Sequence, residues 1–460
     1  MKNKENKQKQ YLHLYVKISE NSLGNFDKSK ITKENEFHIN EKVFVFLKKN
    51  NEIIIDKNQS SKENSEHILF CVRPIKENKI QLENIFNIDS LTLTEENINS
   101  LNYKLWYVIK DYPEENEKKN NNIIKNDINE DYYLCQNDII RLGNFKFILK
   151  EIHLKNHNED FFENNKNKLK YDIHDINKNN NPVFEFTPKL EFYTLEENKN
   201  IICNTCKNSI CDKYNPIVSL CDCDSYKNKH YKCLKEEFEQ QINNNKIQNK
   251  NKTSTNYILK CHCYNCKTQI PLSFQIEEVN QKYELIDFNK PKEKDYLFFE
   301  SLEYATKSGD YEKSFHLMEL NNDKNSDIIT ITIGRDGSRE KLRDNDIKIF
   351  EPSVSRDKHA VIEYNTKKGT LLLQNKSLRS DTLIAIKDVL KINRNKIHLQ
   401  IGRTFVEACL LNENEIKEIK KIKTREEYFN EIIVDMKKNE GETTMFLSDS
   451  DYFDNIGKIY

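Results

Sequence analysis

The sequence predicts a multidomain, mainly β protein, in which a small cysteine-rich α+β module separates two β-sandwiches and a helical, disordered tail follows. Short runs that alternate apolar and polar residues, such as YLHLYVKIS at 11–19, recur through residues 10–155 and again through 297–412. Such runs between polar turns are typical of the strands of a sandwich. Nine of the twelve cysteines fall between residues 203 and 266, which marks a separate module.

The composition limits the classes of protein to consider. The chain has 460 residues, enough for roughly three domains. Its formal net charge of −1 argues against a nucleic-acid binder that relies on bulk electrostatics. No apolar run approaches the ~20 residues of a membrane span, and no apolar segment follows the basic start MKNKENKQKQ. We therefore expect a protein of a reducing compartment, the cytoplasm or alternatively the nucleus, without a membrane span.

Pattern and composition divide the chain into ranges. These are a β-sandwich at 10–155, a polar linker at 156–198, the cysteine-rich module at 199–275, a connector at 276–296, the second β-sandwich at 297–412, and a helix with an acidic tail at 413–460.

The first sandwich contains a pattern that returns later in the chain. Its strand candidates are YLHLYVKIS, FHIN, KVFVFL, EIIIDK, HILFCVRPI and KLWYVIKDY, followed by a strand pair around Gly143 in YYLCQNDIIRLGNFKFILKEI. The last of these resembles the later stretch IHLQIGRTFVEACLL, which suggests an internal repeat. Two interpretations stay open: a degenerate copy of the second sandwich without its binding residues, or an unrelated β domain.

The cysteine-rich module is predicted to bind metal. Its ligand candidates form four pairs: Cys203 with Cys206, Cys221 with Cys223, His230 with Cys233, and Cys263 with Cys266. A Cys-x-x-Cys turn lets two thiolates converge on one tetrahedral ion, so eight ligands suffice for two closed zinc sites. The alternative is a disulfide knot, which an intracellular chain of this size does not need. The segment CLKEEFEQQINN is predicted to be a helix, with Leu234, Phe238 and Ile242 on one face.

The order of these ligands, four cysteines, one histidine and three cysteines, resembles the RING-CH (RING-variant) zinc domain. That resemblance implies cross-braced pairs: Cys203, Cys206, His230 and Cys233 at one ion, and Cys221, Cys223, Cys263 and Cys266 at the other. Cys261 is the alternative to Cys263, although Cys263 restores the two-residue spacing to Cys266. Cys211 is expected to be a free thiol.

The second sandwich resembles the forkhead-associated (FHA) domain. Gly-Arg in ITITIGRDGS, Ser-Arg and His-Ala in EPSVSRDKHAVIEY, and the closing Ile-Gly-Arg-Thr occur in the order of that family. The combination with the zinc module resembles RING-CH plus FHA proteins of the kind common in ciliates. FHA domains bind phosphothreonine peptides through loops at one end of a sandwich, so the resemblance implies a phosphothreonine-containing partner protein.

The resemblance assigns phosphopeptide-binding roles to particular residues. Arg335 is expected to bind the phosphate, because the planar guanidinium donates two hydrogen bonds at once to an anion of nearly two charges. Ser355 is expected to offer its hydroxyl, with Arg356 and Thr382 as further peptide contacts. His359 corresponds to a structural histidine that braces the loop.

Two departures from the FHA pattern bear on these roles. Ser355 and His359 are four residues apart where the family has three, so either Ser353 or Ser355 is displaced. In addition, Asp381 stands where the family has an asparagine, and a carboxylate there opposes phosphate binding.

Two functions of different classes follow. The first is an adaptor or scaffold with two structural zinc ions and a phosphopeptide-reading domain. The alternative is a RING-type ubiquitin ligase that recruits a ubiquitin-conjugating enzyme and selects phosphorylated substrates; such a domain needs no catalytic residue of its own. Thr205 and Glu237 favour the adaptor, because RING-CH domains tend to carry an aliphatic residue and a tryptophan at these docking positions.

Overall fold

The protein is described by a computed structural model that places a defined part of the chain. The described residues are 10–19, 31–48, 53–57, 65–75, 79–83, 105–109, 132–154, 191–192, 201–221, 223–248, 253–266, 268, 270–276, 281–302, 313–320, 326–335, 345–349, 351–377, 380–386, 389–392, 396–401 and 404–421. Strands dominate, and the two helices among these residues are α3 (Tyr231–Asn244) and residues 413–421, which confirms the mainly β prediction. Neither is long and apolar enough to cross a membrane.

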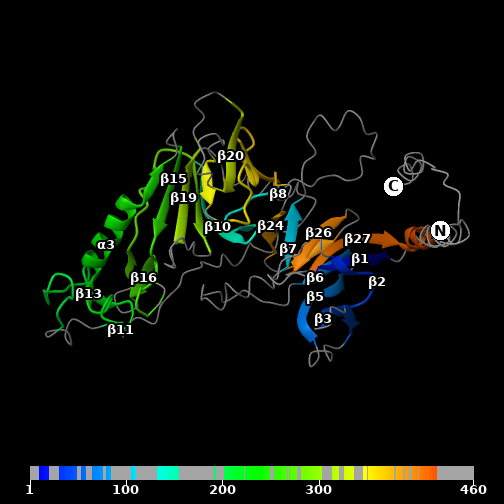
Figure 1. Cartoon of the computed structure of the whole chain (residues 1–460), viewed down its shortest axis with the longest axis horizontal. Coiled ribbons are helices and arrows are strands. Elements are labelled where there is room, and N and C mark those ends of the chain that lie inside the picture. Colours follow the sequence, from blue (N-terminus) through cyan, green and yellow to red (C-terminus); the bar gives the residue numbers. More distant parts are fainter. Residues whose placement is uncertain are drawn as a thin grey trace, which may run out of the picture.

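Among the described residues, the largest sheet has twelve strands, and it runs along the length of the molecule (Figure 1). In spatial order the strands are β14 (Lys246–Gln248), β15 (Ser254–Leu259), β19 (Lys313–Glu319), β18 (Tyr296–Ser301), β10 (Phe145–His153), β9 (Ile139–Leu142), β24 (Thr382–Ala385), β7 (Trp106–Ile109), β26 (Ile397–Ile401), β27 (Thr404–Asn412), β1 (Gln10–Ser19) and β2 (Ile31–Ile39).

Two five-stranded sheets complete the sandwiches. One has the order β21 (Ile347–Ile349), β20 (Ile328–Arg335), β22 (Ala360–Asn365), β23 (Thr370–Asn375) and β8 (Tyr132–Tyr133). The other has the order β25 (Val389–Ile392), β6 (Lys79–Glu83), β5 (Ser65–Ile75), β3 (Val43–Lys48) and β4 (Ile53–Asp56).

Alternation along the strands builds the core, as the sequence predicts. In β1, Leu12, Leu14 and Val16 are fully buried on the inner face. They share one apolar cluster with Val45 of β3 and Val72 of β5 on the facing sheet. Successive strand residues point to opposite faces, so the residues between them are left for the outer face.

Strands from the two predicted sandwich ranges share the same sheets. Strands β1 to β10 pair in the same order as strands β18 to β27, and each set gives its last three strands to the other. In the N-terminal set, β1 pairs with β27, β7 with β26, and β6 with β25. The equivalent pairs in the C-terminal set are β18 with β10, β24 with β9, and β23 with β8. One pairing differs in sense: β21 is parallel to β20, whereas β4 is antiparallel to β3.

This pairing places the two similar sequence stretches in equivalent positions. Hairpin β9–β10 turns at Gly143, whose φ is +58°, and completes the sheet of the C-terminal strand set. Hairpin β26–β27 occupies the corresponding place beside β1 and β7. The duplicated strand order therefore accords with the predicted internal repeat.

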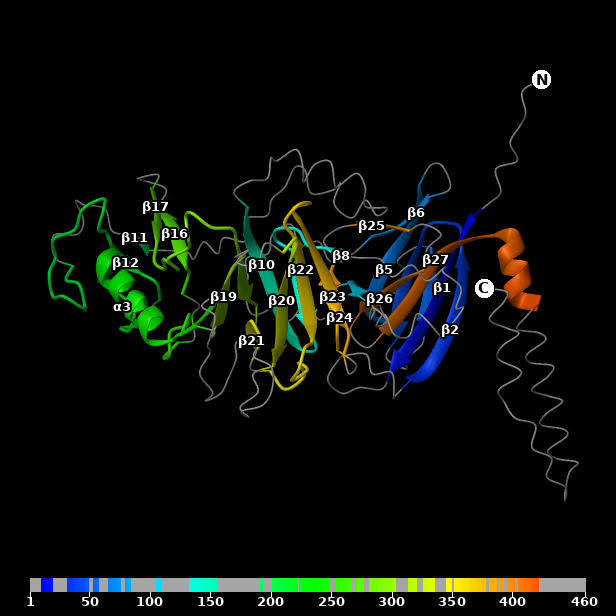
Figure 2. The ribbon, with the colours of Figure 1, turned by 90° about the horizontal axis from the view of Figure 1, so that it is seen from above.

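The cysteine-rich module forms one end of the molecule, beyond the two sandwiches (Figure 2). Its small sheets are β11 (Glu191–Phe192), β12 (Ile217–Ser219) and β13 (Lys229–His230), and the pair β16 (Ser273–Ile276) and β17 (Gln281–Glu284). Helix α3 buries Leu234, Phe238 and Ile242, which confirms its predicted apolar face. Tyr283 and Phe288, in the predicted connector, are buried in the same apolar cluster, so this segment packs as part of the module.

Some predictions lie outside the described residues. The linker at 156–198 does so except for β11, and the acidic tail does so from residue 422 onward. The helix predicted at the start of that tail is present at 413–421. Asn412 caps it, because its Oδ1 accepts hydrogen bonds from the backbone N–H groups of Asn414 and Glu415. The Glu415 carboxylate in turn accepts a hydrogen bond from the backbone N–H of Asn412.

Candidate functional site

The structure brings the eight predicted metal ligands together in two interleaved groups. The first group, site 1, is Cys203, Cys206, His230 and Cys233; the second, site 2, is Cys221, Cys223, Cys263 and Cys266. Within each group the ligand atoms all lie within 4.8 Å of one another. The first and third pairs of the sequence thus meet at one point, and the second and fourth pairs at another.

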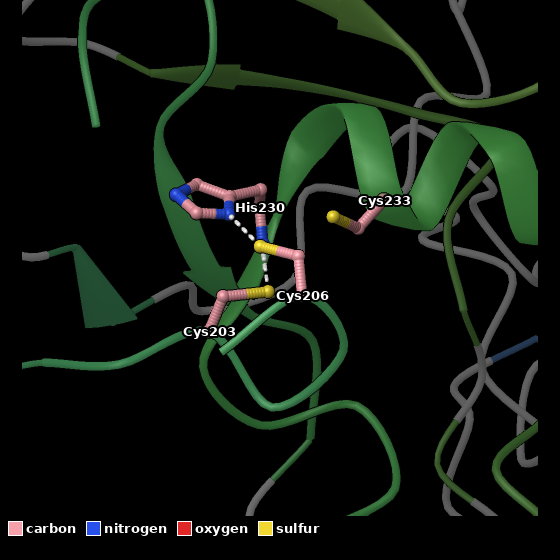
Figure 3. A group of neighbouring side chains, drawn as sticks. All are labelled: Cys203, Cys206, His230 and Cys233. Carbon is pink, nitrogen blue, oxygen red and sulfur yellow. Dashed lines mark hydrogen bonds between the residues drawn. The ribbon is translucent and has the colours of Figure 1, made fainter. Parts of the chain in front are cut away.

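Site 1 is assembled from a turn, a strand end and a helix start (Figure 3). Cys203 and Cys206 lie on a tight turn in which Lys207 adopts a positive φ of 59° and its N–H bonds to the Cys203 carbonyl. His230 ends β13, and Cys233 lies in the first turn of α3, with its sulfur directed toward the other side chains.

The His230 ring is held in the orientation that a metal ligand needs. Its Nδ1 lies 3.2 Å from Cys206 Sγ, and its Nε2 lies 2.9 Å from the carbonyl oxygen of Ile210. A proton on Nε2, donated to that carbonyl, leaves the lone pair of Nδ1 facing the cysteines. Backbone carbonyls commonly orient metal-ligating histidines in this way.

Site 2 joins the loop after β12 to the second Cys-x-x-Cys turn. Cys223 Sγ lies 3.2 Å from Cys221 Sγ, 3.1 Å from Cys263 Sγ and 3.6 Å from Cys266 Sγ. The turn is closed by the Cys263 N–H, which donates to the Thr268 carbonyl over 2.9 Å.

Both donor sets fit zinc. Four sulfurs bonded at about 2.3 Å to one tetrahedral ion lie about 3.8 Å apart, close to the separations in site 2. Burial raises the pKa of Cys203, but hydrogen bonds from the backbone N–H groups of Cys206, His230 and Thr205 outweigh it and lower that pKa to about 6. The Cys263 thiol lowers the pKa of Cys223 to about 6. Both sites thus contain a thiolate near neutral pH, the form that binds metal.

The two cysteines predicted to be alternatives or spare thiols lie outside both groups. Cys261 is 1% exposed, and burial raises its pKa to about 12. Cys263, and not Cys261, belongs to site 2, as its spacing predicts. Cys211 is half-buried and belongs to neither group.

The second candidate site is the end of the sandwich where β20 meets the loop 351–359. Gly334 must lack a side chain, since a Cβ would lie 2.5 Å from both the Asn345 amide and the Asp357 carbonyl. The Arg335 N–H donates to the Ser355 carbonyl over 2.8 Å, which places these two residues side by side. Arg335 is half-buried as a whole residue, and its guanidinium donates through Nη1 to the Pro352 carbonyl over 2.8 Å.

His359 holds this loop, in line with its predicted structural role. It is fully buried, and its Nδ1 accepts a 3.1 Å hydrogen bond from the Ser355 N–H. Burial lowers the pKa of His359 to about 4, against the opposing effect of a hydrogen bond with the backbone of Asp381. The neutral ring therefore accepts a hydrogen bond from Ser355 in the loop 351–359 and contacts the backbone of Asp381 in the next loop.

The inserted residue leaves Ser353 and Ser355 in different surroundings. Ser355 Oγ lies 2.6 Å from Ser377 Oγ, at the meeting point of two loops. Ser353 Oγ donates to Glu351 and accepts from the Asn144 N–H, so it is engaged inside the protein. Of the two serines, Ser355 is thus the one that stands beside Arg335.

The remaining two predicted contacts differ in accessibility. Arg356 is exposed at the tip of the loop. Thr382 is fully buried, and its hydroxyl donates to Asn375 Oδ1 over 2.8 Å. In this arrangement Thr382 supports the loop from inside and does not face a peptide.

Sequence reasoning missed two neighbours of this site. Ser377 belongs to no recognisable sequence motif. It contacts Ser355 only because the loop 351–359 and the loop after β23 converge. The Gly143–Asn144 turn comes from the N-terminal strand set, and a Cβ at Gly143 would lie 2.6 to 2.8 Å from Ser353. The similarity of the two hairpins was the one available signal, because it hints that β9–β10 has a place in the second sandwich.

Comparison with known proteins bears on this second site. Neither the curated proteins nor the solved structures gave a match, and no RING-CH family model matched the cysteine-rich module. The model of the FHA domain matches residues 331–406, the stretch that contains Arg335, Ser355 and His359. The chain therefore contains an FHA domain at residues 331–406.

Proposed function

We propose that this protein is an adaptor that binds phosphothreonine-containing proteins through its FHA domain and folds its cysteine-rich module around two structural zinc ions. The observation that carries the first part is the contact between Arg335 and Ser355 at the end of β20. This backbone hydrogen bond makes Arg335 and Ser355 neighbours, and a guanidinium and a hydroxyl together provide several donors for the three oxygens of a phosphate.

The loop chemistry supports a phosphate ligand. The Arg335 guanidinium gives one hydrogen bond to Pro352, which leaves most of its five N–H donors for an anion. Ser355 and Ser377 place two hydroxyl oxygens 2.6 Å apart near the same loop, and the exposed Arg356 adds charge. The negative charge of Asp381 opposes the positive charges of Arg335 and Arg356. We therefore expect weaker phosphopeptide binding than an asparagine at that position would give.

The zinc proposal rests on the donor chemistry. Three thiolates with one imidazole, and four thiolates, are donor sets of structural zinc sites, and both are closed by four protein ligands. No position is left for a reacting water, so the ions would serve folding. When bound, zinc supplies the cross-links that join the turns, β13 and α3 into one module.

A RING-CH ubiquitin ligase is the second candidate, and one observation favours it. The interleaving of the ligand pairs is the cross-brace that the RING-CH resemblance implies. The polar character of Thr205 and Glu237 counts against it, because the docking surface for a ubiquitin-conjugating enzyme is apolar. The module does expose Ile210, Tyr214 and Tyr264, at 76%, 60% and 73%, and either a ligase or an adaptor can use such residues for protein contacts.

A peptide-binding experiment tests the adaptor proposal. The full chain is presented with a library of peptides in phosphorylated and unphosphorylated forms. We expect selective binding of phosphothreonine peptides that Arg335→Ala reduces by at least tenfold, about 1.4 kcal/mol. Lys367→Ala is the matched control, because Lys367 pairs with Asp327 beside the β22–β23 turn, at the other end of β22 from His359. Equal binding of both peptide forms would refute the proposal.

A further inference from the structure

The outer face of hairpin β1–β2 carries a second kind of ligand cluster. His13 of β1 and His38 of β2 are directly opposite each other in the antiparallel register, and Glu36 lies two residues from His38 on the same face. The inner face of β1, with Leu12 and Leu14 fully buried, faces the core. The outward side chains of His13, Glu36 and His38 are 16% to 19% exposed, so an ion can reach them from solvent.

The three ligand atoms converge on one point. His13 Nδ1 lies 3.2 Å from His38 Nε2, and Glu36 Oε1 lies 3.5 Å from His13 Nδ1 and 3.7 Å from His38 Nε2. Two atoms bonded to a tetrahedral zinc at about 2.0–2.1 Å lie about 3.3 Å apart. The triangle of two nitrogens and one oxygen therefore has nearly the size of one face of a zinc tetrahedron.

We propose that His13, Glu36 and His38 form a third metal site, which binds a divalent transition ion of the zinc class. Two imidazoles and one carboxylate suit zinc and its neighbours in the first transition row, whereas Mg²⁺ and Ca²⁺ prefer oxygen ligands alone. Three protein ligands leave the fourth tetrahedral position to water or another ligand. Sites 1 and 2 are closed by four ligands each, so this site exchanges its ion more readily.

The position in the fold gives the site a structural consequence. Among the strands that the structure describes, β2 is the last of the twelve-stranded sheet and pairs with β1 alone. Edge strands are held on one side only and tend to open or to pair with other chains. An ion bound by His13 from β1 and by Glu36 and His38 from β2 fastens the edge strand to its neighbour.

Metal counting on the full chain tests the proposal. The protein is equilibrated with excess Zn²⁺, and bound zinc is compared between the wild type and the variants His13→Ala, His38→Ala and Glu36→Gln. We expect each histidine variant to lose one zinc ion per chain relative to the wild type. Glu36→Gln should weaken the same site by at least about tenfold, the lower limit seen even for loss of an outer-shell partner. Comparison with the wild type makes the result independent of occupancy at sites 1 and 2.

Glu34→Gln is the matched control, since Glu34 lies on the same strand and face but accepts a hydrogen bond from Tyr15. It should retain the zinc ion that the histidine variants lose. A second readout needs no variant: added Co²⁺ should broaden the ring signals of His13 and His38 in the spectrum of histidine-labelled protein. Unchanged zinc content in the histidine variants, or broadening confined to other histidines, would overturn the proposal and leave the two rings as a simple hydrogen-bonded pair.

Discussion

Thr205 and Glu237 are hydrogen-bonded to each other, with Thr205 Oγ1 donating to Glu237 Oε1 over 3.2 Å. Glu237 also accepts from Lys229 Nζ at 2.7 and 2.9 Å. This polar network connects the ligand turn of site 1 to helix α3. RING-CH domains tend to carry an aliphatic residue and a tryptophan at these two positions, which dock the ubiquitin-conjugating enzyme. In this protein the side chains at these two positions, Thr205 and Glu237, are instead hydrogen-bonded to each other.

The first prediction concerns this pair. The double variant Thr205→Ile, Glu237→Trp should accelerate ubiquitin discharge from at least one enzyme in a conjugating-enzyme panel, whereas the wild type should not. An aromatic anchor contributes about 2 kcal/mol or more to such an interface, so the double variant should bind the conjugating enzyme at least about thirtyfold more tightly than the wild type and accelerate discharge accordingly. Adding Cys203→Ala to the double variant should abolish it. Discharge by the wild type that Cys203→Ala removes would establish the ligase instead.

The second prediction separates the ligands from the spare cysteines. Cys203→Ser and Cys263→Ser should each remove one zinc ion from the purified chain, as measured by elemental analysis. Cys261→Ser and Cys211→Ser should remove none, because neither sulfur belongs to a ligand group. The comparison of Cys261 with Cys263 is the sharpest, since only two positions separate them. Loss of zinc from the Cys261 variant, with retention in the Cys263 variant, would reverse the assignment at site 2.

The ligand groups could be predicted from the sequence because their signal is local. The spacing of each pair and the order of the pairs are visible in the chain, and so is the periodicity that buries Leu234, Phe238 and Ile242 of α3. The alternation in β1 and β20 is similarly local. In each case, neighbouring residues determine the outcome.

The exchange of strands could not be predicted, because alternation shows that a segment is a strand but not which edge it joins. Strand β7 is buried on both faces and lies between β24 and β26, two strands of the other set. The contact from Asn144 to Ser353 joins residues 209 positions apart. His13 and His38 likewise meet only through the register of β1 and β2.

The third prediction tests the contribution of the N-terminal strands to the peptide site. Gly143→Ala places a methyl group 2.6 to 2.8 Å from Ser353 at a residue whose φ is +58°. We expect it to weaken phosphopeptide binding and to lower stability by more than the 1–2 kcal/mol that a left-handed alanine costs. Gly369→Ala is the control, because its φ of +62° imposes the same backbone strain at the turn 365–369. Equal effects of the two variants on peptide affinity would exclude the role of the Gly143 turn.

The fourth prediction is a pH dependence of stability that His359 causes. The folded pKa of His359, about 4, lies below the ordinary histidine pKa of 6.5, so the unfolded chain takes up the proton first as the pH falls. His359 therefore leaves stability unaffected above pH 6.5 and reduces it progressively between pH 6.5 and 4, by about 3 kcal/mol in total. Urea unfolding across that range should show a smaller loss for His359→Gln than for the wild type. Identical pH profiles would contradict the buried, neutral state of the ring.

The fifth prediction concerns the exchange of strands between the two sets. Residues 297–412 expressed alone lack β7 to β10, so β18 and β23 each lose one neighbour and β24 loses both neighbours that it has in the whole chain. Their unpaired edges and exposed apolar side chains should prevent cooperative unfolding and phosphopeptide binding. Co-expression with residues 1–155 should restore both, and the two fragments should purify as a one-to-one complex.

The opposite result has an equally definite meaning. If the fragment 297–412 folds alone as a monomer and binds peptide with the affinity of the whole chain, it keeps its own last three strands, β25 to β27, in its own sandwich. The control is fragment 1–155 with β8 to β10 deleted. Co-expression of this shortened fragment should not rescue folding or peptide binding of fragment 297–412. Because β10 also pairs with β18 through residues 147–153, the deletion removes the pairing that joins β18 to the N-terminal set. Rescue by the intact fragment and failure of the deleted one would localise the dependence to those three strands.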